Sequence, residues 1–170
     1  MNYFELFEIP VQLQVDQSVL PRKYFELSRR YHPDFFVNGT REEQAQALER
    51  SAQLNKAFQT FRHPDETIRY VLSLKGLLEE EEKYNLPPDF LMEVMELNES
   101  LMDEEDENPG VLAAVSRLEN EIYAPVKSII EQYRNDTATE ADLLAVKEYY
   151  FKKKYIDRIR KQQNRPSGLI

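Results

Sequence analysis

The sequence predicts an all-α protein built from two helical modules. Apolar residues recur at helical spacing along most of the chain, whereas alternating apolar and polar runs joined by turn pairs are absent. A stretch rich in glutamate and proline divides the chain near its middle, as a module boundary would. The 170 residues suffice for one ordinary domain or two small ones.

The first long helix of the N-terminal module is expected from Ser18 to Tyr31. Ser18 is suited to cap this helix, and Pro21 is tolerated in its first turn. The helix should end at Tyr31 because the residue before Pro33 avoids helical backbone angles. One face is apolar and consists of Leu20, Tyr24, Leu27 and Tyr31. The opposite side carries four cations, Arg22, Lys23, Arg29 and Arg30.

A short loop should join this helix to a second, longer one. The loop covers residues 32–40 and turns at Asn38-Gly39, and the long helix runs from about Arg41 to Arg62. Its apolar face consists of Ala47, Leu54, Phe58 and Phe61. Because the loop is short, the two helices are expected to form an antiparallel hairpin. Short helices at Tyr3–Phe7 and Pro64–Leu74 would cover its open side.

Three longer helices are expected in the second half of the chain. They cover about Pro88–Asp103, Pro109–Arg134 and Thr139–Gln163 and would form a small antiparallel bundle. Pro125 should kink the middle helix. That helix has an apolar stripe of Val111, Val115, Leu118, Ile122, Val126, Ile129 and Tyr133. We therefore predict modules at residues 1–75 and 88–170, joined by a linker at residues 76–87.

Composition excludes several classes of site. Cysteine is absent, which excludes disulfides, thiolate zinc sites, thiol nucleophiles and cysteine-held iron–sulfur clusters, and the chain has only four glycines. The net charge of −9 is concentrated in residues 76–136, whose net charge is −13, so nucleic acid is not expected as a ligand. Neither a secretory signal nor an apolar run of about 20 residues occurs, and we expect a cytoplasmic protein with no membrane partner.

The tripeptide His-Pro-Asp occurs twice, in different contexts. The first copy, His32-Pro33-Asp34, follows the helix with the basic side, at the tip of the predicted hairpin. The second, His63-Pro64-Asp65, is interpreted as a helix stop with Pro64 in the first turn of the next helix. The copies lie near opposite ends of the long helix, on the order of 30 Å apart. A metal site shared by the two copies is therefore not expected, and a nucleophile for hydrolysis is lacking.

The order of these motifs resembles a known family. The helices NYFELFEIP and LPRKYFELSRRY, the HPD loop and the helix ending AQLNKAFQTFRHP resemble a J domain. The segments RYVLSLKG and FLMEVMELNESLMDE and a C-terminal helical pair extend the likeness to the HscB family, the small J proteins of bacterial iron–sulfur cluster assembly. The resemblance implies an L-shaped, two-domain co-chaperone with no catalytic residue, cofactor or metal of its own.

The resemblance also implies a chaperone partner. Family members stimulate ATP hydrolysis by HscA, an ATPase chaperone of the DnaK class. The implied contact residues are His32, Pro33, Asp34, Arg22, Lys23, Arg29 and Arg30. The chain departs from the family at Phe35, where lysine is common after the tripeptide, and at Thr67, where arginine is usual. Phe35 removes one positive charge and could shift the contact toward apolar groups.

The first bundle helix has more apolar surface than one buried stripe requires. Its core stripe is Phe90, Val94, Leu97 and Leu101. Leu91, Met92, Met95 and Met102 lie farther round the helix, so they form either an adaptable binding patch edged by carboxylates or a wide core face. By resemblance this patch holds the cluster scaffold protein IscU. The implied scaffold-binding residues are Leu91, Met92, Met95, Glu96, Glu99, Asp103 and Tyr155, the last of which could equally be core.

Two other function classes remain open from the sequence. A J protein could serve a different client, with the acidic bundle acting as a general adapter or holdase. A metal-dependent hydrolase built on the two histidines is the other alternative.

Overall fold

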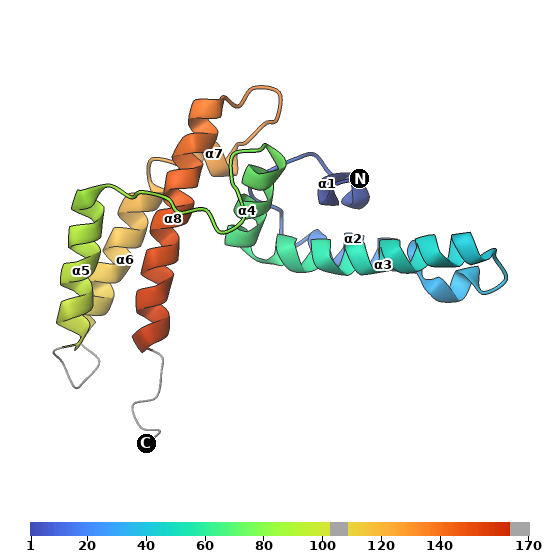
Figure 1. Ribbon diagram of the computed structural model, residues 1–170, viewed down its shortest axis with the longest axis horizontal. Coiled ribbons are helices and arrows are strands. Elements are labelled where there is room, and N and C mark those ends of the chain that lie inside the picture. Colours follow the sequence, from blue (N-terminus) through green and yellow to red (C-terminus); the bar gives the residue numbers. More distant parts are fainter. Residues whose placement is uncertain (103–108, 164–170) are drawn as a thin grey trace, which may run out of the picture. The chain divides into compact units, whose positions relative to one another are not determined.

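The computed structural model describes residues 1–102 and 109–163, and every regular element within them is helical (Figure 1). The predicted all-α class is therefore confirmed. The elements are α1 (Tyr3–Phe7), α2 (Leu20–Tyr31), the 3₁₀ helix η1 (Pro33–Phe36), α3 (Arg41–Arg62), α4 (Pro64–Leu74), α5 (Pro88–Met102), α6 (Pro109–Tyr123), α7 (Lys127–Glu131) and α8 (Glu140–Gln163).

The chain forms two compact units. Unit 1 comprises Met1–Lys75 together with Glu131–Ala138, and unit 2 comprises Gly76–Ile130 together with the chain from Thr139 onward. Helices α1 to α4 therefore belong to unit 1, and the helices that pack into a bundle, α5, α6 and α8, belong to unit 2.

Unit 1 is organised around the α2–α3 hairpin. The Tyr24 ring stacks on Phe58 at 4.2 Å, and the Arg50 guanidinium lies 5.4 Å from the Tyr31 ring centroid. Because a later residue of α2 meets an earlier residue of α3, the two helices run antiparallel, as predicted. The core of unit 1 is centred on Phe61, which is fully buried and surrounded by rings of the N-terminal segment. These rings are Tyr3, Phe4 and Phe7.

Two helix starts in unit 1 differ from expectation. Ser18 does not cap α2, because its backbone N–H and its hydroxyl both donate to the Asp16 carboxylate, at 2.8 and 2.6 Å. The helix begins at Leu20 without a side-chain cap. The capping box lies on α3 instead, where the Thr40 hydroxyl accepts from the Glu43 N–H and the Glu43 carboxylate accepts from the Thr40 N–H.

Unit 2 is a three-helix bundle in which Pro125 has a stronger effect than predicted. Instead of a kinked helix, the chain forms α6 and α7, separated at residues 124–126. Proline lacks the N–H that would bond the preceding turn, and its ring clashes with the carbonyl there. The register changes across this break, so Ile130 is buried, whereas Ile129 of the predicted stripe is only half-buried. The stripe up to Val126 is buried as predicted.

Part of the segment expected to be a linker is tied to α8. The Lys147 ammonium lies 2.9 Å from the Glu82 carboxylate, and the Tyr84 ring stacks on Phe151 at 4.7 Å. Leu86 is also buried. These contacts join residues 82–86 to the bundle, in agreement with the assignment of this segment to unit 2.

Candidate functional site

The first His-Pro-Asp tripeptide is an exposed corner between α2 and η1. His32 leaves the helix with extended backbone angles, and Pro33 starts the 3₁₀ turn. The Asp34 N–H donates to His32 Nδ1 at 3.2 Å, which leaves the ring proton on Nε2. The two side chains are 52% and 85% exposed. The corner therefore presents an N–H donor and a carboxylate acceptor side by side, both open to a partner.

The four cations that the sequence places on one side of α2 are not equivalent. Glu8, which ends α1 in the left-handed conformation at φ 56°, accepts from both Lys23 (3.1 Å) and Arg30 (2.6 Å). The hydrogen bonds from Lys23 and Arg30 lower the pKa of the Glu8 carboxyl below its usual value. Two of the four charges are thus paired within the unit, which the sequence analysis did not anticipate.

The other two cations face outward. Arg22 and Arg29 are exposed, and neither makes an ion pair with any residue in the part of the chain that the structure describes. The Arg29 guanidinium lies 5.8 Å from the centroid of the Phe25 ring. Arg22 and Arg29 are therefore the residues of this helix that present free positive charge to a partner.

The second tripeptide is a helix boundary, as predicted. His63 stands between α3 and α4, and Pro64 is the first residue of α4. Nearby, Thr67 is only 1% exposed, and its hydroxyl lies 3.1 Å from the carbonyl oxygens of both Thr60 and His63.

The two tripeptides are separated along the chain by the 22 residues of α3. Among residues 1–102 and 109–163, no group of three or more His, Asp or Glu side chains is placed to hold a metal ion.

The methionine-rich face of α5 is exposed. Phe90 and Val94 are buried, while Met92, Met95 and Met102 are 61%, 62% and 79% exposed. The alternative of a wide core face is therefore wrong for these methionines. Leu91 is half-buried, and the carboxylates of Glu96 and Glu99 are exposed. Asp103, the remaining acidic member of the predicted set, lies outside the described residues.

Tyr155 lies at the surface of α8 rather than in its core. Its exposed fraction is 37%, and the Arg158 guanidinium lies 5.4 Å from its ring centroid. The core positions of this part of α8 are Ile156 and Ile159, both almost fully buried. A partner on unit 2 can therefore reach the Tyr155 ring.

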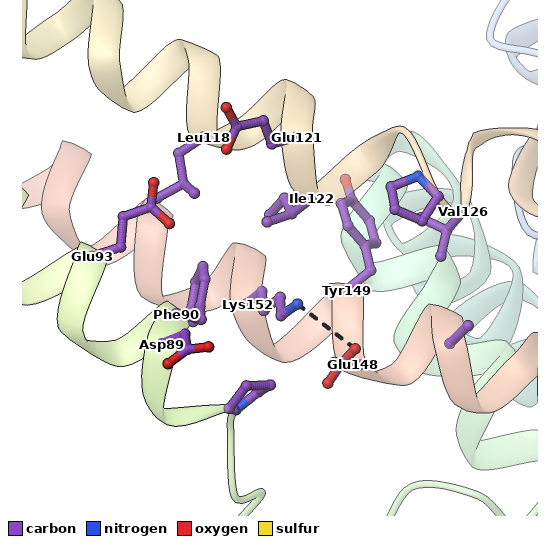
Figure 2. A pocket seen from close by; sticks show the side chains of 13 residues that line it. Asp89, Phe90, Glu93, Leu118, Glu121, Ile122, Val126, Glu148, Tyr149 and Lys152 are labelled. Atoms are coloured by element: carbon purple, nitrogen blue, oxygen red, sulfur yellow. Dashed lines mark ion pairs between the residues drawn. The ribbon is translucent and has the colours of Figure 1, made fainter.

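A pocket of about 320 Å³, which the sequence analysis missed, lies between α5, α6 and α8 (Figure 2). Phe90, Leu118, Ile122 and Tyr149 contribute apolar surface to it. The acidic residues around it are Asp89, Glu93, Glu121 and Glu148, the last paired with Lys152 at 3.7 Å. Measured around α5 from Phe90, Asp89 lies about 100° and Glu93 about 60° to one side, whereas Leu91 lies about 100° and Met95 about 140° to the other.

The tripeptide corner, the free cations and the methionine face are exposed groups on a helical protein, and their chemistry suits contacts with other proteins. A family model described as "HSCB C-terminal oligomerisation domain" matches residues 86–163. The "Co-chaperone protein HscB homolog" of Photobacterium profundum is 35% identical over 164 residues, which cover 94% of this chain and 93% of the relative.

Solved structures agree with this relationship. The crystal structure of human co-chaperone protein HscB matches with a TM-score of 0.77 and 29% identity, over 96% of this chain and 80% of that one. Chaperone HscB from Vibrio cholerae matches with a TM-score of 0.63 and 32% identity, over 97% and 96%.

The chain belongs to the HscB family of co-chaperones. This is a non-enzymatic family, and membership implies a chaperone partner. None of the helices in the described part of the chain is long and apolar enough to cross a bilayer.

Proposed function

We propose that the protein acts in the cytoplasm and stimulates ATP hydrolysis by an HscA/DnaK-class chaperone, to which it delivers an IscU-type scaffold protein. The main support is the exposed His32–Asp34 corner at the end of a helix that carries free cations. Through these two functions the protein would aid the maturation of iron–sulfur proteins.

In this proposal the chaperone contact is formed by His32, Pro33, Asp34 and the basic side of α2. Positive charge on α2 steers an acidic surface toward it and raises the association rate. The Nε2–H of His32 and the Asp34 carboxylate then hydrogen-bond to the ATP-bound chaperone. Of the four basic residues, Arg22 and Arg29 contribute most, because Lys23 and Arg30 are paired with Glu8.

The scaffold contact is formed by α5 and α8 of unit 2. Methionine side chains are flexible and polarisable, so an exposed group of them suits an adaptable apolar interface. The proposed set comprises Leu91, Met92, Met95, Glu96, Glu99, Asp103 and Tyr155. The exposure of Met92 and Met95 on the same helix as Met102 supports this assignment, since a group of exposed apolar side chains is typical of an interaction site.

Catalysis belongs to the chaperone. Binding of the J-type surface shifts the chaperone toward the conformation that hydrolyses ATP, and hydrolysis then traps the scaffold that unit 2 has brought. The co-chaperone needs no nucleophile or metal for this role, only affinity for the hydrolysis-competent conformation.

The test of the chaperone contact is single-turnover ATP hydrolysis by the cognate HscA-class chaperone. Asp34→Asn and His32→Gln should abolish stimulation, because each removes a hydrogen-bonding group of the exposed corner. His63→Gln is the matched control, since the same side chain is exposed there in a helix boundary. Normal stimulation by Asp34→Asn would contradict the assignment of this corner.

The scaffold contact is tested by isothermal titration with IscU. The double variant Leu91→Ala/Met95→Ala should weaken binding, while Leu112→Ala, an exposed leucine on α6, should leave it unchanged. If the chaperone is stimulated but IscU does not bind, the protein is an adapter for a different client. Binding that survives the double variant would place the interface elsewhere on the bundle.

A further inference from the structure

We infer that the chaperone-facing surface of unit 1 is a mixed strip of guanidinium, phenyl and imidazole groups along α2 and into η1. The strip consists of Arg22, Phe25, Arg29, His32 and Phe35. The inference rests on the proposed function and specifies the chemistry of the partner: an acidic chaperone surface that also offers apolar contacts for two phenyl rings.

Helix geometry aligns the members of this strip. Arg22, Phe25 and Arg29 are spaced three and four residues apart, so they lie on one face of α2. His32 follows three residues after Arg29, where the helix ends. At 1.5 Å per residue, Arg22 and His32 are about 15 Å apart along the axis. This length suits a shallow groove on a partner rather than a single small-molecule pocket.

The two phenyl rings are exposed yet held in place by other members of the strip. Phe25 is 63% and Phe35 is 70% exposed. The Phe35 ring meets the His32 ring edge-on, with centroids 6.3 Å apart and planes at 81°, and Phe25 lies under the Arg29 guanidinium. Each ring therefore lies beside a polar group of the proposed contact. A partner surface that carries both apolar and polar groups would cover the ring and hydrogen-bond to that polar neighbour.

Charge identifies the partner as acidic. Arg22 and Arg29 are free of ion pairs among the described residues, whereas Lys23 and Arg30 share the Glu8 carboxylate at the side of the helix. An arginine stacked on a ring presents its N–H fork outward, which matches a carboxylate. Nucleic acid would also accept arginine and aromatic groups, but residues 1–75 carry ten basic and ten acidic side chains and so lack the net positive charge that phosphate binding needs.

The test measures ATPase stimulation against co-chaperone concentration for Phe25→Ala and Phe35→Ala. Each variant should raise the half-maximal concentration about tenfold, because burial of a phenyl ring contributes that much or more. Leu48→Ala is the matched control, since Leu48 is 63% exposed on α3 of the same unit and outside the strip. Thermal unfolding of all three variants should match the wild type, because the replaced side chains are exposed.

Salt dependence separates the apolar and ionic parts of the strip. Between about 0.05 and 0.5 M salt, Arg22→Ala/Arg29→Ala should respond less steeply than wild type, whereas the two phenylalanine variants should keep the wild-type slope. Wild-type half-maximal concentrations in both phenylalanine variants, or an equal loss in Leu48→Ala, would overturn the strip and leave the proposed function standing. No stimulation by the wild type would overturn the proposed function and, with it, the strip's partner. If a short single-stranded RNA, added at the chaperone's concentration, competes with the chaperone and lowers ATPase stimulation, the assignment of an acidic protein surface as the strip's partner is wrong.

Discussion

Replacing Lys147 with methionine isolates the energetic role of the contact that ties the segment before α5 to α8. The Lys147 ammonium lies 2.9 Å from the Glu82 carboxylate, and the two side chains are only 12% and 23% exposed. The ammonium also lies 5.7 Å from the Tyr84 ring centroid. Lys147→Met keeps most of the aliphatic volume but leaves the Glu82 carboxylate in this site without its cation.

The burial of the pair determines the expected cost. Exposed ion pairs contribute about 0–1 kcal/mol, whereas loss of one partner from a fully buried pair costs about 3–5 kcal/mol. Lys147 and Glu82 lie between these limits, so we expect Lys147→Met to lower the free energy of unfolding by about 2 kcal/mol. The double variant Glu82→Met/Lys147→Met should recover most of this loss, because no unpaired charge remains.

Urea unfolding followed by far-ultraviolet circular dichroism measures this cost. Lys161→Met serves as the control, since Lys161 is an exposed cation on the same helix that makes no ion pair among the described residues. Its free energy of unfolding should stay within about 0.5 kcal/mol of wild type. The reasoning is refuted if Lys147→Met costs no more than the control, or if the double variant is as unstable as Lys147→Met.

Three further predictions concern unit 1. Phe61→Ala should lower the free energy of unfolding by about 3–5 kcal/mol in urea titrations, because the ring is fully buried among three others; a loss below about 1 kcal/mol would contradict this packing. Tyr70→Phe should cost about 1 kcal/mol, since the Tyr3 N–H donates to the Tyr70 hydroxyl at 2.9 Å, and an unchanged melting temperature would speak against this bond. Glu8 has a lowered pKa, so its stabilising pairs are present above its usual value of 4.5 and are lost as the pH falls through the native pKa. Melting temperatures at about pH 5 and pH 3 should therefore fall less in Glu8→Gln than in wild type, and parallel falls would exclude this role.

Local sequence patterns predicted the helices of unit 1 well because local chemistry sets their ends. Pro33 ends α2 at Tyr31, and Pro64 at the start of α4 ends α3 at Arg62. The same reasoning failed at Ser18 because Asp16, two residues earlier, competes for its hydroxyl and N–H. It also underestimated Pro125, because the choice between a kink and a break depends on how the following turn packs in the bundle.

The tripeptides show how far sequence reasoning extends into the candidate site. Sequence context alone distinguished His32-Pro33-Asp34 from the helix boundary at His63, since only the first follows a basic helix. Exposure of the methionines could not be decided in this way, because an apolar side chain on a helix is equally compatible with core and surface. The structure showed that Met92 and Met95 are exposed, since α6 and α8 pack on the other side of α5.

The sequence by itself therefore determined the helical class and most helix boundaries, because these depend on neighbours within a few positions. The residues proposed for the chaperone contact rest on the resemblance to the HscB family. Tertiary structure alone decided which charges and rings are available to a partner. Glu8 lies 15 residues from Lys23 and 22 from Arg30, and it reaches both because the fold brings the end of α1 to the side of α2. Arg22 and Arg29 remain free for the same reason: the last turn of α1 meets one side of α2 and leaves the other open.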